Sequence, residues 1–171
     1  MIRTHTRRIL LTNRQEDTLQ ALADGYRREE VALRLGISPK SLNAMLCRAR
    51  TRLGTPPCAD TRLIAVACMS DAIWVSPPPD LPVRVPKNLR YLIAPLSDGM
   101  QAVEIANERR LPYSRLIADC HKLRQLMEAR TSAHLVARLW QHELAPMASQ
   151  TQTDSTLPRS RTAVPQLQSK K

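Results

Sequence analysis

The sequence predicts an all-α protein made of two small four-helix domains, and three observations lead to this prediction. The chain of 171 residues is 43% hydrophobic, yet only 3% of it is aromatic and it contains no Phe. Its core must therefore be aliphatic, which suits small helical domains better than sheets. The apolar positions follow helical spacing, and a pattern recurs at an offset of 74 residues, with LADG at 22–25 and LSDG at 96–99. A repeat of this length is one compact unit used twice.

Composition divides the chain into four parts. Residues 1–75 form the first domain and residues 87–145 the second. Between them lies SPPPDLPVRVP at 76–86, whose five prolines predict a semi-rigid, extended linker. Residues 146–171 are rich in Ser, Thr, Gln and Pro, which predicts a disordered basic tail.

Capping signals predict the first two helices of the first domain. Thr12, with Gln15 three residues later, forms a capping box at the start of the first helix, and Gly25 ends it. The second helix spans REEVALRLG at 28–36, with two acidic residues in the first turn, where the helix dipole favours them, and a terminal glycine.

The third helix of the first domain has the clearest signals. Ser38 is its expected N-cap and Pro39 its first residue. Its apolar residues form a single buried stripe, namely Leu42, Leu46, Ala49 and Leu53. A fourth helix is expected from Thr61 to Ile73.

The other side of this third helix predicts contact with DNA. Two short helices joined by a tight turn, the second long and basic, form a helix-turn-helix. From Val31 to Gly54 the chain has no acidic residue, so a face turned toward phosphate would meet no repulsion. With the apolar stripe inward, the residues expected to project elsewhere are Asn43, Ala44, Cys47, Arg48, Arg50 and Thr51. The small and amide side chains allow close approach to base edges, and Arg48 and Arg50 can reach phosphates.

The charge of the chain also indicates a polyanionic partner. The formal net charge is +11, and the pI is about 10.4. Residues 1–75 carry +5 and residues 87–145 carry +3, so the first domain is the stronger electrostatic candidate. Nucleic acid is the leading candidate for that partner. The alternative is that the chain is a generically basic soluble protein.

Several other classes are not expected. No apolar run approaches the ~18 residues of a membrane span, and the N-terminus lacks a signal peptide's hydrophobic stretch, which predicts a cytoplasmic protein. Cys47, Cys68 and Cys120 fall in apolar helical patterns typical of small buried residues, so we expect no metal site and no cofactor. No phosphate-binding loop, nucleophile–base pair or spaced carboxylate set indicates an enzyme.

The segment from Leu11 to Gly54 resembles the DNA-binding domain of bacterial LuxR-type (GerE/NarL-like) regulators, and region 4 of sigma factors shares much of the same pattern. The matching residues are Leu11, Thr12, Arg14, Ala23, Gly25, Glu30, Ala32, Leu35, Ile37, Ser38, Ser41, Leu42, Arg52, Leu53 and Gly54. The resemblance implies a four-helix domain whose third helix enters the major groove and whose fourth helix often dimerises.

Carried over by position, this resemblance implies roles for individual side chains. Base-edge contacts fall on Asn43, Ala44 and Cys47. Backbone contacts fall on Lys40, Ser41 and Arg48. Asn43 replaces the family's usual lysine, and Asn pairs naturally with adenine. The loop after Gly54 is about two residues longer than the pattern.

The second domain resembles the same family more weakly, over about residues 96–143. Leu116, Cys120, Leu123 and Met127 repeat the buried stripe, and the positions of the base readers fall on Ile117, Ala118 and His121. The departures from the pattern are Pro95 inside the expected first helix, Arg109 at a core position, Arg110 at the turn glycine, and Asp119, which would repel phosphate if exposed. The candidate DNA contacts are Arg115, Ala118, His121 and Lys122. Whether this domain binds DNA or another protein stays open.

These observations predict a sequence-specific, double-stranded-DNA-binding transcription regulator with tandem helix-turn-helix units and no sensor domain, acting on the nucleoid. A second copy of the chain and RNA polymerase are candidate further partners. The alternatives are the DNA-recognition module of a recombination or replication system and a sigma-region-4-like adaptor of RNA polymerase. We expect residues 1–75 alone to retain specific DNA binding, and the second domain to bind weakly or not at all.

Overall fold

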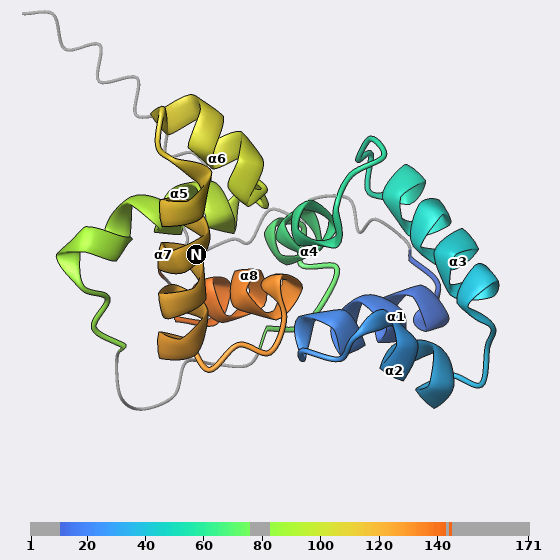
Figure 1. The fold of residues 1–171 in the computed structure, drawn as a ribbon. Coiled ribbons are helices and arrows are strands. Elements are labelled where there is room, and N and C mark those ends of the chain that lie inside the picture. Colours follow the sequence, from blue (N-terminus) through green and yellow to red (C-terminus); the bar gives the residue numbers. More distant parts are fainter. Residues whose placement is uncertain (1–10, 76–82, 143, 145–171) are drawn as a thin grey trace, which may run out of the picture.

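Every regular element of the structure is helical, as the sequence predicts (Figure 1). The computed structural model describes residues 11–75, 83–142 and 144, so the predicted tail and most of the predicted linker lie outside the described residues. The elements are α1 (Asn13–Ala23), α2 (Arg28–Arg34), α3 (Pro39–Arg52), α4 (Asp60–Met69), the 3-10 helix η1 (Lys87–Leu92), α5 (Ile93–Ser97), α6 (Ala102–Arg109), α7 (Tyr113–Leu126) and α8 (Ser132–Gln141). We call α1–α4 the first helical set, and η1 with α5–α8 the second helical set.

The helices of the two sets recur at the offset seen in the sequence. Both α3 and α7 have 14 residues, and α7 begins 74 residues after α3. In the second set, η1 and α5 together correspond to α1, so one helix is replaced by a 3-10 helix and a short α-helix. Pro95, which the sequence predicts to kink or end a helix here, lies in α5. The connection to the fourth helix is residues 53–59 in the first set and 127–131 in the second, which is two residues shorter.

The predicted helix starts are confirmed in the first set. The Thr12 backbone N–H donates to Oε1 of Gln15 at 3.0 Å, and the Gln15 N–H donates back to the Thr12 hydroxyl at 3.4 Å. Ser38 Oγ accepts the backbone N–H of Ser41 at 3.1 Å, and Pro39 is the first residue of α3. Each cap satisfies a donor that the first helical turn would otherwise leave unpaired.

The turn before α7 has the same backbone geometry as the turn before α3, although it lacks glycine. Gly36 has φ 61°, and Arg110, 74 residues later, has φ 52°. A residue with a Cβ in this left-handed region costs about 1–2 kcal/mol. The arginine therefore strains the turn without removing it, and the second set keeps the helix–turn–helix connection.

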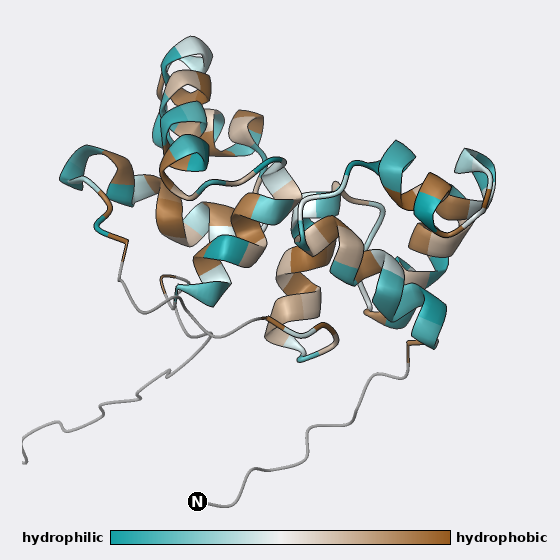
Figure 2. Ribbon diagram, turned by 90° about the horizontal axis from the view of Figure 1, so that it is seen from below, coloured by the Kyte–Doolittle hydropathy of each residue, from teal (hydrophilic) through white to brown (hydrophobic). Residues whose placement is uncertain are grey.

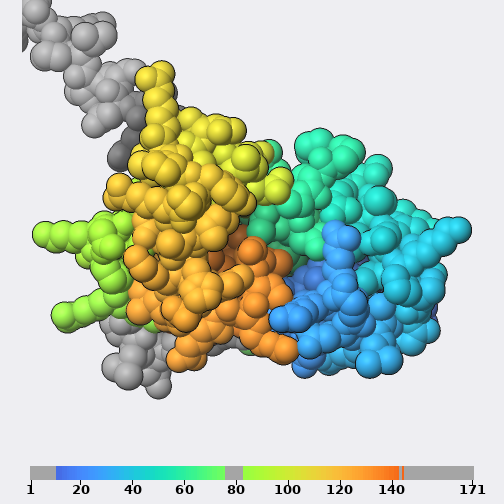
Figure 3. All heavy atoms as spheres, in the orientation of Figure 1, coloured from blue at the N-terminus to red at the C-terminus, as the bar shows by residue number. Residues whose placement is uncertain are grey.

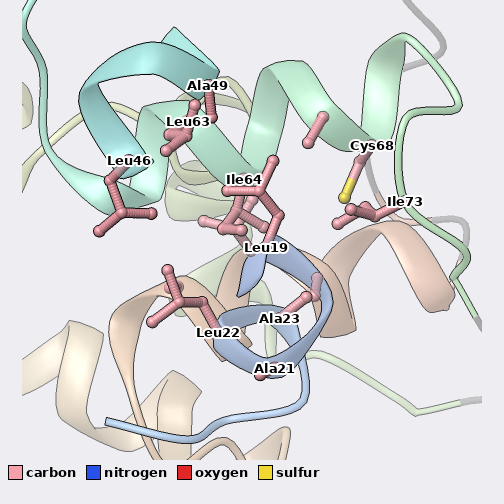
Figure 4. Close-up of a cluster of buried hydrophobic side chains, with 14 of the residues drawn as sticks. Leu19, Ala21, Leu22, Ala23, Leu46, Ala49, Leu63, Ile64, Cys68 and Ile73 are labelled. Carbon is pink, nitrogen blue, oxygen red and sulfur yellow. The ribbon is translucent and has the colours of Figure 1, made fainter. Parts of the chain in front are cut away.

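The fourth helix ends earlier than expected. The sequence predicts a helix to Ile73, but α4 ends at Met69 and Asp71 takes φ 52°. Ile73 is nevertheless buried beside Cys68, because the chain folds back over the end of α4 (Figure 4). The apolar pattern that suggested a longer helix thus reflects a buried turn.

The core of the first set is aliphatic and includes residues from the second. Leu19 of α1 and Ile64 of α4 are fully buried and lie side by side (Figure 4). Three residues of α8 complete the same cluster, namely Ala133, Val136 and Ala137. Residues 1–75 therefore do not hold a closed core by themselves, which argues against the expectation that this fragment retains specific binding alone.

Helix α8 lies at the junction of the two sets, packed against α1 and α4 (Figures 1 and 3). Its Leu135 and Leu139 belong to the second core. In Figure 2 the hydrophobic ribbon gathers at the middle of the molecule, and much of the hydrophilic ribbon lies on the outlying helices. Glu30 also pairs with Arg130 across the junction at 3.0 Å, but both side chains are exposed, so this ion pair contributes little.

Gly99 provides a test of this junction. An added Cβ at Gly99 would collide with the backbone of Arg62 in α4, whereas one at Gly54 would meet no atom within 4 Å. Both glycines have positive φ, at 77° and 66°, so both alanine variants share the backbone strain. We expect Gly54→Ala to lower the free energy of unfolding by about 1–2 kcal/mol, and Gly99→Ala to lower it at least twice as much. Urea denaturation measures both, and equal losses would show that Gly99 does not sit in a close contact.

His134 makes the junction sensitive to acid. Its Nδ1 accepts the backbone N–H of Arg130 at 3.2 Å, and its ring lies against Gly25. Burial, and then the nearby Arg138, lower the pKa of His134 below its usual value of 6.5. The unfolded chain therefore binds a proton more readily, so the stability that this residue contributes is present above about pH 6.5 and is lost as the pH falls below it.

We accordingly expect the free energy of unfolding to fall between pH 7 and pH 5, and to fall less in His134→Asn. Asparagine keeps an acceptor for the Arg130 N–H but does not titrate. His142 stays in both proteins, so the difference isolates His134. Thermal unfolding at both pH values measures the effect, and identical pH dependence in the two proteins would contradict this assignment.

Candidate nucleic-acid interface

Helix α3 presents a polar, acid-free face opposite its buried stripe. The stripe is confirmed, since Leu42, Leu46 and Ala49 are each at most 1% exposed. The exposed side chains of α3 and its cap are Ser38, Pro39, Lys40, Ser41, Asn43, Ala44, Cys47, Arg48, Thr51 and Arg52. All the base-edge candidates are therefore solvent-accessible, and so are Lys40, Ser41 and Arg48 among the backbone candidates.

Arg50 does not project into solvent, and the prediction that it does is wrong. Its side chain is only 12% exposed, and its Nη2 lies 3.0 Å from Oδ1 of Asp60. The carboxylate at the start of α4 draws the guanidinium inward, because a partly buried arginine needs a compensating charge. Arg50 therefore links α3 to α4, and it does not add a free positive charge to the face.

Cys47 also departs from one expectation. The helical pattern indicated a small buried residue, but Cys47 is exposed on α3. It follows directly after Leu46 and so points away from the stripe. Cys68 is buried, which agrees with the pattern, and burial raises the pKa of its thiol to about 12. Cys120 is only partly buried.

A network of side chains that the sequence did not reveal supports the start of α3. Arg28 of α2 holds Asp60 with two hydrogen bonds of 2.7 Å, from its Nε and its Nη2. Its Nη1 donates to Oδ1 of Asn43 at 3.1 Å. The bond to Asp60, ahead of the opposing effect of burial, raises the pKa of Arg28. Asn43 is thus held by Arg28, and Arg28 is held by Asp60.

The sequence contained one signal for this network. Asp60 is the only acidic residue between Glu30 and Asp71, in a segment with several arginines. A lone carboxylate among guanidinium groups is a candidate structural anchor. Its partner Arg28 lies 32 residues away, and no spacing rule connects the two.

Helix α7 occupies in the second set the position of α3 in the first. The four predicted contact residues are all exposed, namely Arg115, Ala118, His121 and Lys122. Ile117 is 43% exposed and adds an apolar side chain to this face. The face of α7 is therefore accessible, but it is more apolar at its start than the face of α3.

Asp119 does not oppose phosphate from the surface of α7. It is only 7% exposed, and its Oδ2 accepts the hydroxyl of Tyr91 at 2.9 Å. Lys122 lies 3.4 Å from the other oxygen. Burial, and then the bond to Asp119, raise the pKa of Tyr91 to about 12, so the phenol stays protonated and keeps donating. The condition under which Asp119 would repel DNA is thus not met.

Neither a metal site nor a membrane span has geometric support in the part of the chain that the structure describes. No three His, Cys, Asp or Glu side chains there are placed to share a metal ion. None of the helices of residues 11–75 and 83–142 combines the length and the apolar character that crossing a bilayer needs. The remaining candidate surface is the pair of exposed faces on α3 and α7.

Comparison with known proteins gives no match to a family model, to a curated protein or to a solved structure. The case for a nucleic-acid interface therefore depends on the residues and contacts of this chain.

The anchoring role of Asp60 can be measured directly. Asp60→Ala leaves Arg28 and the partly buried Arg50 without their carboxylate, so we expect the free energy of unfolding to fall by about 1–3 kcal/mol. Asp17→Ala, at an exposed position on α1, is the matched control and should change it by less than about 0.5 kcal/mol. Urea denaturation compares the free energies of unfolding of the two variants. Equal losses would show that Asp60 does not anchor Arg28 and Arg50.

Proposed function

We propose that this protein binds double-stranded DNA sequence-specifically through α3, and that it regulates transcription in the cytoplasm, on the nucleoid. The observation that carries the proposal is the face of α3. Helix α3 has 14 residues and no acidic side chain, and it follows α2 across a short turn. It presents Asn43, Ala44 and Cys47 to solvent. Helix-turn-helix proteins place the start of such a second helix against base edges in the major groove.

The side chains on this face divide into two chemical groups, which supports the proposal. Asn43 can accept from and donate to adenine, and Ala44 and Cys47 are small enough to let the helix approach the bases. Lys40 and Arg48 are exposed on either side of these three residues along α3 and can neutralise phosphates. The LuxR-type resemblance adds the same assignment by position.

The support of Asn43 by Arg28 strengthens the proposal. An amide that must read a base edge loses less entropy on binding when a neighbour already fixes its orientation. Arg28 donates to one lone pair of Oδ1 at 3.1 Å, which leaves the second lone pair and both amide protons of Asn43 for a base. Arg28 is therefore a positioning residue for the proposed base contact.

The contribution of Arg48 gives a quantitative test. If Arg48 neutralises one phosphate, Arg48→Ala should weaken binding to all duplexes about equally, and should reduce the slope of log K against log salt by about 0.9. Arg84→Ala, an exposed arginine that lies on neither α3 nor α7, removes the same charge and should leave the slope nearly unchanged. Fluorescence titrations at several salt concentrations measure both slopes. A wild-type slope in Arg48→Ala would contradict the proposed contact between α3 and DNA.

The biological use of the binding is tested by mapping bound sites across the genome. Peaks centred on promoters would support a transcription regulator. A few clustered sites at replication origins or at the ends of mobile elements would instead support a recombination or replication module. In either case the sites should share a sequence, because the proposed contacts are to base edges.

A further inference from the structure

The two helical sets touch one another through reciprocal contacts. Gly25, at the end of α1, lies against the ring of His134, which is the third residue of α8. Gly99, 74 residues after Gly25, lies against the backbone of Arg62, which is the third residue of α4. Each set therefore places the glycine after its first helix, at the equivalent position, on the start of the other set's fourth helix.

A second pair of equivalent residues lies at the same junction. Glu30, at the start of α2, pairs with Arg130, two residues before α8 begins. Glu104, the equivalent residue at the start of α6, lines a small cleft together with Cys58, which lies two residues before α4 begins. In a two-fold interface, residue i of the first unit contacts residue j of the second, and residue j of the first contacts residue i of the second. The two glycine contacts have this reciprocal arrangement. The chain thus contains within itself the interface that a symmetric dimer forms between two chains.

The helices that form this interface bury most of their apolar side chains within the chain. In α4 the buried residues are Leu63, Ile64, Ala65, Ala67 and Cys68, and Val66 is half-buried. In α8, Val136 and Ala137 pack into the first core, while Leu135 and Leu139 pack into the second. Among the described residues of α4 and α8, Met69 is the one large apolar side chain that is exposed, at 42%, so these helices offer a second copy of the protein little apolar surface to dock against.

The same pairing leaves α3 and α7 on opposite sides of α4 and α8 (Figure 1). Two helix-turn-helix units related by a two-fold axis read two inverted half-sites, with centres about 10 bp or a multiple of that apart. In a homodimer the two half-sites have the same sequence because the two recognition helices are the same. In this chain the two helices have different sequences, so the two half-sites must have different sequences too.

The difference falls on the residues placed to contact bases. At equivalent positions, α3 exposes Asn43, Ala44, Cys47 and Arg48, and α7 exposes Ile117, Ala118, His121 and Lys122. Asn43 suits adenine, whereas an exposed isoleucine offers only apolar contact, which suits the methyl group of thymine. His121 replaces a thiol with a ring that can donate or accept a hydrogen bond.

From these contacts we infer that a single chain binds one duplex at two unlike, inverted half-sites, α3 reading one and α7 the other. This inference depends on the proposed DNA binding. It adds that the target is asymmetric, that one chain occupies it, and that the second helical set reads DNA.

Selection of bound sequences from a random duplex library by the full chain tests the inference, with the mass of each complex measured by sedimentation. We expect two unlike elements at a fixed spacing and one chain per duplex. Asn43→Ala should reduce the preference at one element by about 10- to 100-fold and leave the other intact, and His121→Ala should do the reverse. Both residues are exposed, and unchanged circular dichroism and unfolding midpoints confirm that the variants fold.

The spacing gives a matched control on the DNA. Adding about 5 bp between the two elements turns one of them to the opposite side of the duplex, so the full chain should lose the affinity that the second element contributes. A palindromic site with two chains per duplex would overturn the inference, and so would a site with one element. Selection of no sequence at all would reject the proposed DNA binding as well, which distinguishes the two failures.

Discussion

The packing of α8 against α1 and α4 is the interaction on which the rest of the structure depends. Ala133, Val136 and Ala137 are small, so the helix approaches the first helical set closely, and its Leu135 and Leu139 remain free to fill the second core. A helix that is apolar on both sides can join two cores without leaving hydrophobic surface exposed. Because α8 belongs to both cores, the first set is complete only when the second is present, and neither set can rotate without breaking these contacts.

This constraint also holds α3 and α7, the two helices proposed to contact DNA. Asp60 is the first residue of α4, and its carboxylate binds Arg28 of α2 and Arg50 of α3. The helix at the junction is therefore tied to α2 and to α3. In the second set, Asp119 has a comparable role, since it joins α7 to η1 through the hydroxyl of Tyr91. In both sets an acidic side chain holds the third helix on the side away from its exposed face.

The parts of the structure that local chemistry determines were predictable from the sequence. The Thr12–Gln15 box, the Ser38 cap and the buried stripe of α3 each depend on residues within a few positions of one another. The burial of Arg50 was not predictable, because its partner Asp60 belongs to another helix, and charge alone suggested an exposed arginine. The same is true of the core shared through α8, since a hydrophobic pattern shows which face is buried but not which helix covers it. The Pro-rich segment suggested separate domains, and only the packing reveals that the two sets share a core.

Native-state hydrogen exchange in increasing denaturant shows whether the α8 contacts make the two sets one cooperative body. We expect the slowest amides of α1, α4, α7 and α8 to exchange through one common opening, with the same free energy and the same denaturant dependence. If the amides of α1 and α4 instead opened together at a clearly lower free energy while those of α7 and α8 stayed protected, the two sets would fold separately, and the account would be contradicted.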